Sequence, residues 1–452
     1  MTNLNLDHVA VIGAGGKMGS GISLLLVQEV ALQAEEQNRC PTITLIDSNE
    51  KSLFPLKQYL RGQITKFAEK NVITLREVYR DDQQLVSNEE MIHHFVNRAL
   101  EYTNFSTSLE SAKSANIIFE AIVEDASVKT ELYKFLKDQC SHHTFFLTNT
   151  SSIPISYLNA EANLNNRIIG YHFYNPPAVQ KLLEIIPPDN VDTNLLTFSQ
   201  DLGKRLKKTI VYSRDVAGFI GNGHFIPEGL YACKQVDHLT SHHSLHEAVY
   251  MLNKVTEEYL IRPMGIFQLI DYVGIDVFQN ITKTMRQHLK DESFDHPLIN
   301  AMVENGVLGG QNPDGSQKDG FFQYSGTKII GYYDFEKKEY IPAENAQWRK
   351  SCDEKLGTLP KEHLPWKKML KESKREERIE QYFQHLFVGT TMGQTLARDY
   401  LNQSVEIALS LVNANVAKSL SDVSTVLKTG FFHLYGPEVS WIKHNESVGS
   451  SK

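Results

Sequence analysis

The sequence predicts an α/β protein in which a doubly wound parallel sheet is followed by an all-helical region. The first observation is that short β-branched runs alternate with longer segments of helical spacing as far as about residue 205. Alternation of this kind is typical of a parallel sheet that is covered by helices. The second observation is that the strand signal then fades, and residues 216–300 have the spacing of long helices.

The first predicted element is a strand at residues 8–13, HVAVIG, which has the character of a buried parallel strand. A glycine-rich turn follows, and residues 22–37 then have helical spacing and length. Residues 42–48, TITLIDS, form the next predicted strand. This order of strand, glycine turn, helix and strand is the opening βαβ unit of a Rossmann-type dinucleotide-binding fold.

The glycine turn predicts a site for a pyrophosphate. Glycines allow the backbone to approach the phosphates closely, and the following helix N-terminus supplies N–H donors. Gly13, Gly15 and Gly19 give the spacing G-x-G-x-x-x-G, one residue longer than the usual fingerprint. Gly16 and Gly19 fit the usual spacing only with Ala14 in the first position. We interpret the turn as a lengthened phosphate loop, and a tight turn without a ligand is the alternative.

Asp47 ends the second predicted strand, where an acid hydrogen-bonds the ribose hydroxyls of the adenosine. Its charge would repel a 2′-phosphate, and the following Ser48 and Asn49 offer no cation. The sequence therefore favours NAD over NADP as the cofactor. The alternative is that Asp47 caps a turn or a helix.

The remaining elements of the first domain follow the same alternation. Residues 50–112 look mostly helical and charged, and a helix is expected after residue 127. Four further strands are predicted, at residues 115–124, 144–150, 167–173 and 181–186. Residues 331–375 are irregular and support no assignment, whereas residues 371–383 form a charge-laced helix with a solvated face.

His172 is the strongest candidate for chemistry. It lies at the end of a predicted strand, just before Asn175, and should project at the carboxyl edge of the sheet, where ligands bind. Twelve residues later, Glu184 is an acid flanked by apolar residues in the next strand. A buried carboxylate needs a partner, and an imidazole supplies one. Among 17 histidines most are surface or hydrogen-bonded residues, but this one has an acid partner beside a dinucleotide site.

Composition excludes several classes of function. The formal net charge of −8 makes nucleic acid and anionic lipid unlikely partners. The four cysteines lie far apart without a C-x-x-C pair, which argues against a metal site and favours reduced thiols in a cytoplasmic setting. There is neither an apolar run of 18 residues nor a secretory leader, so we expect no membrane span and no secretion.

An internal repeat is predicted in the helical region. The helix start SLHEAVYMLNKV (residues 244–255) precedes the turn RPMGIF (262–267), and SLSDVSTVLKTGFF (419–432) precedes YGPE (435–438). Each opening serine is followed three residues later by an acid, as in a capping box. Coincidence is the alternative. We expect three domains: an NAD-binding domain at residues 1–205, a helical domain at 206–330, and its diverged second copy at 331–452.

Eight segments follow one another along the chain: GAGGKMG, LID, EAIVED, NTSS, GYHFYNPP, KLLEII, DVAGFIGN and RPMGIFQLIDYVGID. In this order and spacing the sequence resembles the L-3-hydroxyacyl-CoA dehydrogenases from residue 8 to about residue 325. The resemblance implies an NAD-dependent oxidation of (S)-3-hydroxyacyl-CoA to 3-oxoacyl-CoA, of the fatty acid β-oxidation type. The chain departs from the family's usual G-P-F at Gly265-Ile266-Phe267.

The resemblance also implies roles for individual residues. His172 corresponds to the catalytic base, Glu184 to its orienting partner, Ser151 to the serine that bonds the substrate oxygen, and Asn222 to the asparagine near the reacting carbon. Substrate contacts are implied for Ser151, Asn175, Asn222 and Lys70, the last near a coenzyme A phosphate. Cofactor contacts are implied for Gly13, Gly15, Gly16, Lys17, Met18, Gly19, Asp47, Ala121, Glu124, Lys129, Asn149 and Asn175. Plainer alternatives are a helix N-cap for Ser151, a satisfied helix residue for Asn222 and a solvated lysine for Lys70.

Two other functions remain open at this point. A related enzyme class oxidises free 3-hydroxy acids or sugar acids with the same histidine and glutamate, without coenzyme A contacts. The second alternative is a non-catalytic NAD-binding protein. Family members commonly dimerise through the helical domain, so a second copy within the chain implies either a monomer with internally paired helical domains or a homodimer.

Overall fold

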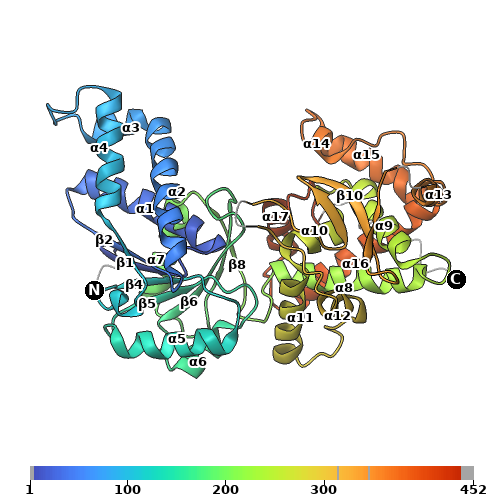
Figure 1. Cartoon of the computed structure of the whole chain (residues 1–452), viewed down its shortest axis with the longest axis horizontal. Helices are drawn as coiled ribbons and strands as arrows, with labels where there is room; N and C mark the ends of the chain where they lie inside the picture. Colours follow the sequence, from blue (N-terminus) through green and yellow to red (C-terminus); the bar gives the residue numbers. More distant parts are fainter. Residues whose placement is uncertain (1–4, 313–314, 345–346, 439–452) are drawn as a thin grey trace. The chain divides into compact units, whose positions relative to one another are not determined.

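The computed structural model describes residues 5–312, 315–344 and 347–438 (Figure 1). The chain divides into two compact units, Met1–Val216 and Ala217–Lys452, which we call unit 1 and unit 2. Each unit has its own hydrophobic core.

Unit 1 contains an eight-stranded sheet whose strand order is β3-β2-β1-β4-β5-β6-β7-β8. Neighbouring strands from β3 through to β6 are parallel, β7 is antiparallel to β6, and β8 is parallel to β7. The predicted doubly wound sheet is confirmed. The strands are β1 (His8–Ile12), β2 (Thr42–Ile46), β3 (Thr103–Ser106), β4 (Ile117–Glu120), β5 (Phe145–Thr148), β6 (Ile168–Phe173), β7 (Leu182–Ile186) and β8 (Thr209–Tyr212).

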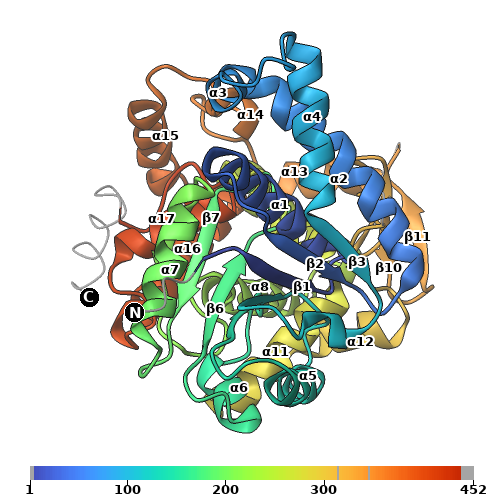
Figure 2. The same ribbon diagram turned by 90° about the vertical axis from the view of Figure 1, so that its left-hand side faces the viewer.

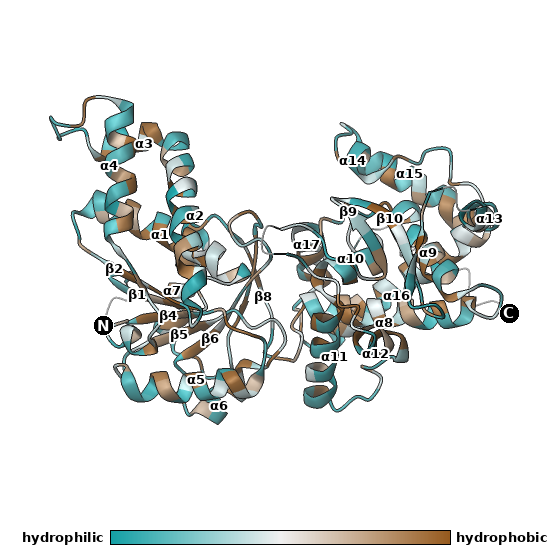
Figure 3. Ribbon diagram, viewed as in Figure 1, coloured by the Kyte–Doolittle hydropathy of each residue, from teal (hydrophilic) through white to brown (hydrophobic). Residues whose placement is uncertain are grey.

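Helices cover both faces of this sheet, with α1 and α7 on one face and α5 and α6 on the other (Figures 1 and 2). The strands between them are apolar, as parallel strands buried on both faces must be, whereas α2–α4 carry long polar stretches (Figure 3). The helices of unit 1 are α1 (Lys17–Gln37), α2 (Glu50–Lys70), α3 (Val72–Val78), α4 (Asn88–Glu101), the 3₁₀ helix η1 (Leu109–Ala112), α5 (Ala126–Gln139), α6 (Ile155–Ala162) and α7 (Thr193–Arg205).

Unit 2 is mostly helical, as predicted, but it also contains a three-stranded antiparallel sheet of order β11-β10-β9. Its strands are β9 (Phe322–Ser325), β10 (Lys328–Asp334) and β11 (Glu339–Pro342). Its helices are α8 (Gly221–Leu239), α9 (Leu245–Lys254), the π-helical segment η2 (Val255–Tyr259), α10 (Ile266–Val273), α11 (Ile275–Leu289), α12 (Pro297–Glu304), α13 (Gln347–Leu356), α14 (Trp366–Met369), α15 (Arg375–Val388), α16 (Met392–Asn413) and α17 (Leu420–Gly430).

Both predicted domain boundaries differ from the structure. The first compact unit ends at Val216 rather than at residue 205, because β8 pairs with β7 and belongs to the sheet. The expected boundary between residues 330 and 331 falls inside β10, which pairs on both sides with its neighbours. A division of the chain there would cut this sheet.

The two segments of the predicted repeat form helix pairs that pack on one another. Ser244 is the N-cap of α9 and forms a capping box with Glu247, and Ser419 is the N-cap of α17, where its hydroxyl accepts from the Asp422 N–H. Helix α8 comes before α9 and packs against it, and α16 comes before α17 and packs against it. Helices α8 and α16 also pack against each other. The contacts of α8 with α17 and of α16 with η2 complete a reciprocal arrangement. The duplication itself stays a prediction.

Among the described residues, none of the helices is both long and apolar enough to cross a membrane. The same residues contain no group of three or more histidine, cysteine, aspartate or glutamate side chains suited to a metal ion. The four cysteines are free thiols.

Candidate functional site

The glycine turn joins β1 to α1 at the carboxyl end of β1. Gly13 has a φ of +78°, and a Cβ there would lie 2.6 Å from the carbonyl oxygen of Ala121, just after β4. Gly16 is the N-cap of α1, which carries no acidic residue in its first turn. A Cβ on Gly19 would lie 1.9 Å from the Gly13 carbonyl oxygen, so Gly19 allows α1 to pack closely on the turn.

These positions match the roles of a phosphate loop. The first glycine makes the turn and the last one permits close packing, while the helix N-terminus presents backbone donors. The chain reverses its order of strands between β1 and β4, which is where dinucleotides bind in such sheets. Lys17 begins α1, and Met18 packs partly buried against the core of unit 1. The residues present therefore fit a bound dinucleotide.

Asp47 follows β2 directly and its carboxylate is already oriented. Its Oδ2 accepts from the Gly15 N–H at 2.9 Å, and its Oδ1 accepts from the Asn49 N–H at 2.9 Å. The second of these bonds is the turn cap that the sequence left open as an alternative. The first ties the acid to the phosphate loop, so the cap does not remove Asp47 from the cofactor side of the sheet.

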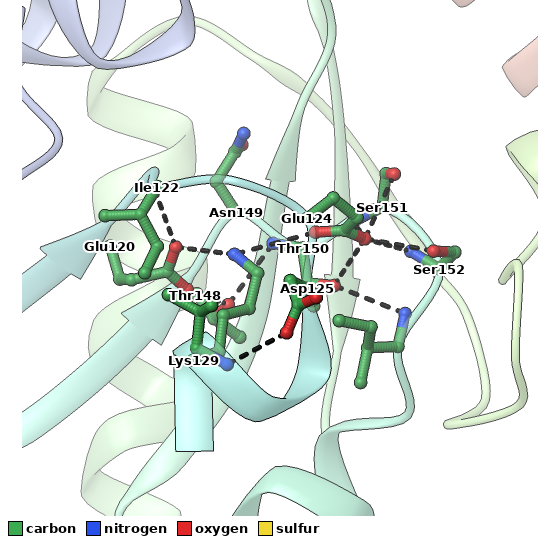
Figure 4. Close-up of polar contacts among 12 residues, drawn as sticks. Glu120, Ile122, Glu124, Asp125, Lys129, Thr148, Asn149, Thr150, Ser151 and Ser152 are labelled. Carbon is green, nitrogen blue, oxygen red and sulfur yellow. Dashed lines mark hydrogen bonds and ion pairs between the residues drawn. The ribbon is translucent and has the colours of Figure 1, made fainter. Parts of the chain in front are cut away.

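Glu124, after β4, is bound by the loop that follows β5 (Figure 4). Its Oε1 accepts from the backbone N–H groups of Ser151 at 2.8 Å and Ser152 at 3.0 Å, and from the Thr150 hydroxyl at 2.7 Å. Burial by itself would raise the pKa of Glu124, but the charge of Lys129 and the donors of this loop outweigh it and leave that pKa below its usual value. Glu124 is therefore held as an anion.

Lys129 lies between two carboxylates and is 1% exposed. Its ammonium pairs with Glu120 and lies 3.5 Å from Glu124 Oε2 (Figure 4). Glu120, fully buried at the end of β4, also accepts from the hydroxyls of Tyr133 and Thr148. Sequence reasoning missed Glu120, although an acid that ends an apolar strand nine residues before a lysine was the available signal.

Asn149 and Ser151 connect the end of β5 to its neighbours. The side-chain oxygen of Asn149 accepts from the Phe173 N–H at 2.8 Å, which joins this loop to the strand end that carries His172. The Ser151 hydroxyl lies 3.3 Å from Glu124 Oε1. Helix α6 begins later, with Pro154 as its N-cap, so Ser151 is not the cap of that helix.

His172 and Glu184 lie directly opposite each other in the antiparallel pair β6–β7. The His172 Nδ1 is 3.0 Å from Glu184 Oε2, the histidine is 8% exposed, and the glutamate is fully buried. Because a carboxylate only accepts hydrogen bonds, Nδ1 carries the proton and Nε2 is the basic nitrogen of the neutral ring. The structure thus brings together the two side chains that the sequence analysis paired.

Tyr174 is the second residue that sequence reasoning missed. Its hydroxyl donates to Glu184 Oε2 at 2.7 Å, so this one oxygen accepts from both Tyr174 and His172. The Tyr174 and His172 rings are in contact, with centroids 4.7 Å apart and planes tilted by 39°. The signal was the i, i+2 spacing in HFYN, which places both side chains on the same side of an extended segment.

Three further predicted residues, Asn175, Lys70 and Asn222, lie at different places in the fold. Asn175 is half-buried just after β6. Lys70 is the exposed last residue of α2, at the junction with α3, away from the sheet (Figure 1). Asn222 is the half-buried second residue of α8 and belongs to unit 2.

The strand ends of unit 1 thus combine a helix N-terminus suited to phosphates, an oriented acid after β2, and an imidazole backed by a carboxylate. An imidazole in this arrangement can take a proton from a substrate hydroxyl, and the carboxylate stabilises the imidazolium that forms. This is the chemistry that accompanies hydride transfer to a nicotinamide.

Two family models match the chain. The model described as 3-hydroxyacyl-CoA dehydrogenase, NAD binding domain, matches residues 8–216. The model described as 3-hydroxyacyl-CoA dehydrogenase, C-terminal domain, matches residues 218–319. Together they cover both the sheet of unit 1 and the first helices of unit 2.

Curated relatives and solved structures give similar results. The mitochondrial hydroxyacyl-coenzyme A dehydrogenase of Sus scrofa is 30% identical over 323 residues, which are 71% of this chain and 91% of the pig protein. A probable 3-hydroxybutyryl-CoA dehydrogenase of Bacillus subtilis is 29% identical over 342 residues, 74% of this chain and 99% of that protein. The structure of 3-hydroxybutyryl-CoA dehydrogenase from Escherichia coli matches with a TM-score of 0.62 and 20% identity, and covers 96% of this chain and 91% of that one. At that identity the match shows the fold alone.

Proposed function

Since the chain belongs to the 3-hydroxyacyl-CoA dehydrogenase family, we propose a residue-level account of its NAD-dependent oxidation of (S)-3-hydroxyacyl-CoA to 3-oxoacyl-CoA. His172 acts as the general base and Glu184 orients it. The single observation that carries this account is the hydrogen bond between His172 Nδ1 and the buried Glu184 carboxylate at 3.0 Å.

The proposed oxidation combines the transfer of a proton to His172 with the transfer of a hydride to the cofactor. NAD bound at the phosphate loop would supply the acceptor for the hydride that leaves C3 of the substrate. His172 Nε2 takes the proton of the C3 hydroxyl, while the Nδ1–H remains on Glu184 and fixes the orientation of the ring. The negative charge of Glu184 stabilises the imidazolium as it forms. General-base catalysis of this kind contributes ~10²–10⁴ in rate.

Glu124 and its loop order the region between cofactor and substrate in this account. The anion of Glu124 holds the backbone of residues 151 and 152, which supports a role for Ser151 in orienting the substrate oxygen. Because Lys129 is buried between Glu120 and Glu124, we assign it the task of holding Glu124 rather than a direct contact with NAD. Asn149 and Asn175 keep the cofactor contacts that the family resemblance implies, and Asn222 keeps its role near the reacting carbon.

The cofactor side is supported by the phosphate loop. Gly13, Gly15, Gly16 and Gly19 suit the pyrophosphate at the N-terminus of α1, and Asp47 suits the ribose hydroxyls of NAD. Lys70 is proposed as a contact for a coenzyme A phosphate because it is an exposed cation at the end of α2.

Replacing His172 by alanine tests the account. With 3-hydroxybutyryl-CoA and NAD, followed through NADH absorbance, His172→Ala should lose at least about 10²–10⁴ in kcat while NAD affinity changes little. The matched control is His93→Ala, because His93 is exposed on α4 and should leave kcat unchanged. Turnover of His172→Ala near that of the wild type would remove this histidine from the mechanism.

Two further measurements use the same assay. Oxidation should accelerate as the pH rises from about 6 to 9, because only a neutral imidazole accepts the substrate proton. A flat profile between about pH 6 and 9 would contradict the assignment of the base. Comparing the thioester with the free 3-hydroxy acid separates this function from the oxidation of free acids.

The proposal extends to assembly and location. The reciprocal packing of α8 with α16, together with the hydroxyl of Tyr435 donating to the Leu260 carbonyl, supports helical regions that pair within one chain and leave less need for a homodimer. The boundary in the sequence between the two proposed copies of the helical domain would then lie after β11 rather than at residue 331. Four free cysteines support a reducing, cytoplasm-like compartment, although the pig relative is named as mitochondrial.

A further inference from the structure

Tyr174 contacts both members of the proposed acid–base pair. Its hydroxyl donates to Glu184 Oε2 at 2.7 Å, and the same oxygen is 3.0 Å from His172 Nδ1. Its ring lies on the imidazole, with centroids 4.7 Å apart and planes inclined at 39°. One side chain therefore holds the carboxylate through a hydrogen bond and the imidazole through ring contact.

The direction of the hydrogen bond follows from charge. Burial and the neighbouring Glu184 carboxylate raise the pKa of Tyr174 well above its usual value. The phenol therefore stays protonated throughout the working pH range. Since an ionised carboxylate has no proton to give, the Tyr174 hydroxyl is the donor.

We infer that Tyr174 is a positioning residue for the proposed base: its hydroxyl fixes Glu184 Oε2 where it receives the His172 Nδ1–H, and it shares the negative charge of that oxygen. The inference rests on the proposed function and deepens it. Tyr174 touches neither the substrate nor the cofactor in this scheme, and it acts through Glu184 and His172.

Two physical effects follow from the shared oxygen. The terminal torsion of a glutamate is broad and roughly two-fold, so a second donor narrows the range of carboxylate orientations. The hydrogen bond from Tyr174 also stabilises the negative charge on Glu184 Oε2, which weakens the attraction of that oxygen for an imidazolium at His172. Without the hydroxyl, Glu184 is less well oriented but attracts a protonated His172 more strongly.

Three other charged side chains of unit 1 have partners of their own. Glu124 is bound by Lys129 and its loop, and Asp215 accepts from the backbone N–H groups of Ile155 and Ser156 at the start of α6, which packs against β6. Lys208 donates to the Pro177 and Gln180 carbonyls in the β6–β7 connection, and burial lowers its pKa to about 8.

Tyr174→Phe removes only the hydroxyl and keeps the ring contact, so it is the informative variant. We expect the poorer orientation of Glu184 to outweigh its stronger attraction for the imidazolium, so that kcat falls by about three- to tenfold, the effect of one lost hydrogen bond, while the KM values for NAD and substrate change little. We also expect the acid limb of the kcat profile to move upward by about 0.5–1 pH unit, because the imidazolium is stabilised. Tyr174→Leu, which also removes the ring, should lose more.

Three controls make the result specific. Tyr212→Phe removes the hydroxyl of a tyrosine that is 42% exposed on β8 and should change neither kcat nor the profile. Lys208→Met shows whether the titration of that lysine contributes to the profile of the wild type. The ¹⁵N signals of the His172 ring, followed with pH in the cofactor-free protein, report the same upward shift in Tyr174→Phe without any assay of activity.

The outcomes separate the inference from the proposed function. If His172→Ala is inactive while Tyr174→Phe keeps the wild-type kcat, profile and ring titration, the inference is wrong and the proposed function stands. If Tyr174→Phe changes only the unfolding temperature, the tyrosine has a structural role and the inference is again wrong. If His172→Ala retains turnover, the proposed function itself fails.

Discussion

The close packing of α1 on the glycine turn predicts opposite effects for the same substitution at two positions. A Cβ on Gly19 would lie 1.9 Å from the Gly13 carbonyl oxygen and 2.9 Å from the Ala14 Cα, and neither is a flexible side-chain end. Ordinary contact begins near 3.4 Å, so Gly19→Ala requires α1 to shift by about 1.5 Å from the turn. At Gly62, which is exposed within α2, an added Cβ would meet no atom within 4 Å apart from its chain neighbours and the backbone of its own helix.

The magnitudes follow from these distances. Overpacking typically lowers the free energy of unfolding by ~1–3 kcal/mol. Because the atom in the way at Gly19 belongs to the backbone and cannot move aside easily, we expect Gly19→Ala to lose about 3 kcal/mol. With ~2–4 °C per kcal/mol for a unit of this size, the unfolding temperature of unit 1 should fall by roughly 6–12 °C. Gly62→Ala should instead stabilise the chain by ~0.5–1 kcal/mol, because alanine loses less backbone entropy in a helix than glycine does.

Thermal unfolding followed by circular dichroism measures both changes, and calorimetric titration with NAD adds a functional readout. Gly19→Ala should bind NAD more weakly because the turn that receives the phosphates is displaced, whereas Gly62→Ala should bind it as the wild type does. Wild-type stability and NAD affinity in Gly19→Ala would show that α1 does not depend on this contact, and the assignment of the phosphate loop would lose its main structural support.

Two further predictions concern buried contacts. Lys129→Met leaves the buried carboxylate of Glu120 without its cationic partner, so the free energy of unfolding measured in urea should fall by about 3–5 kcal/mol. The double variant Glu120→Gln/Lys129→Met removes both charges and should lose clearly less. Equal losses in the two variants would contradict a paired charge. Ending the chain after residue 344 removes the segment whose Tyr382 and Tyr435 hydroxyls bond the Tyr259 and Leu260 carbonyls, so light scattering should detect dimers or aggregates, and a soluble, active monomer would refute internal pairing.

The parts of the fold that could be predicted from sequence are those with a local signal. The strand, glycine turn and helix at the N-terminus are encoded within thirty residues, and the third glycine is needed for a contact only six residues away in sequence, at Gly13. The pairing of His172 with Glu184 was predictable because a buried acid in a neighbouring strand requires a partner. Short, continuous hydrophobic runs made β1, β2, β5, β6 and β7 recognisable.

What sequence reasoning missed depends on contacts with distant partners. Strand β8 has only four residues with one of them buried, and it exists because β7 offers an edge. Strands β9–β11 support one another and follow a polar loop that gives no strand signal. Glu120 and Tyr174 were passed over because each looks ordinary in sequence, and their importance comes from the ammonium and the carboxylate that the fold brings to them.

The antiparallel register of β6 and β7 has a consequence for how this chain can change. Side chains alternate between the two faces of a strand, so the insertion or deletion of a single residue inside β7 would turn Glu184 away from His172 and bring a hydrophobic neighbour in its place. Changes of length in the connection after Asn175 leave both that alignment and the bond from Tyr174 to Glu184 intact. The later part of this loop can therefore vary in evolution or engineering, whereas a shift of one residue in either strand would separate the proposed base from its carboxylate.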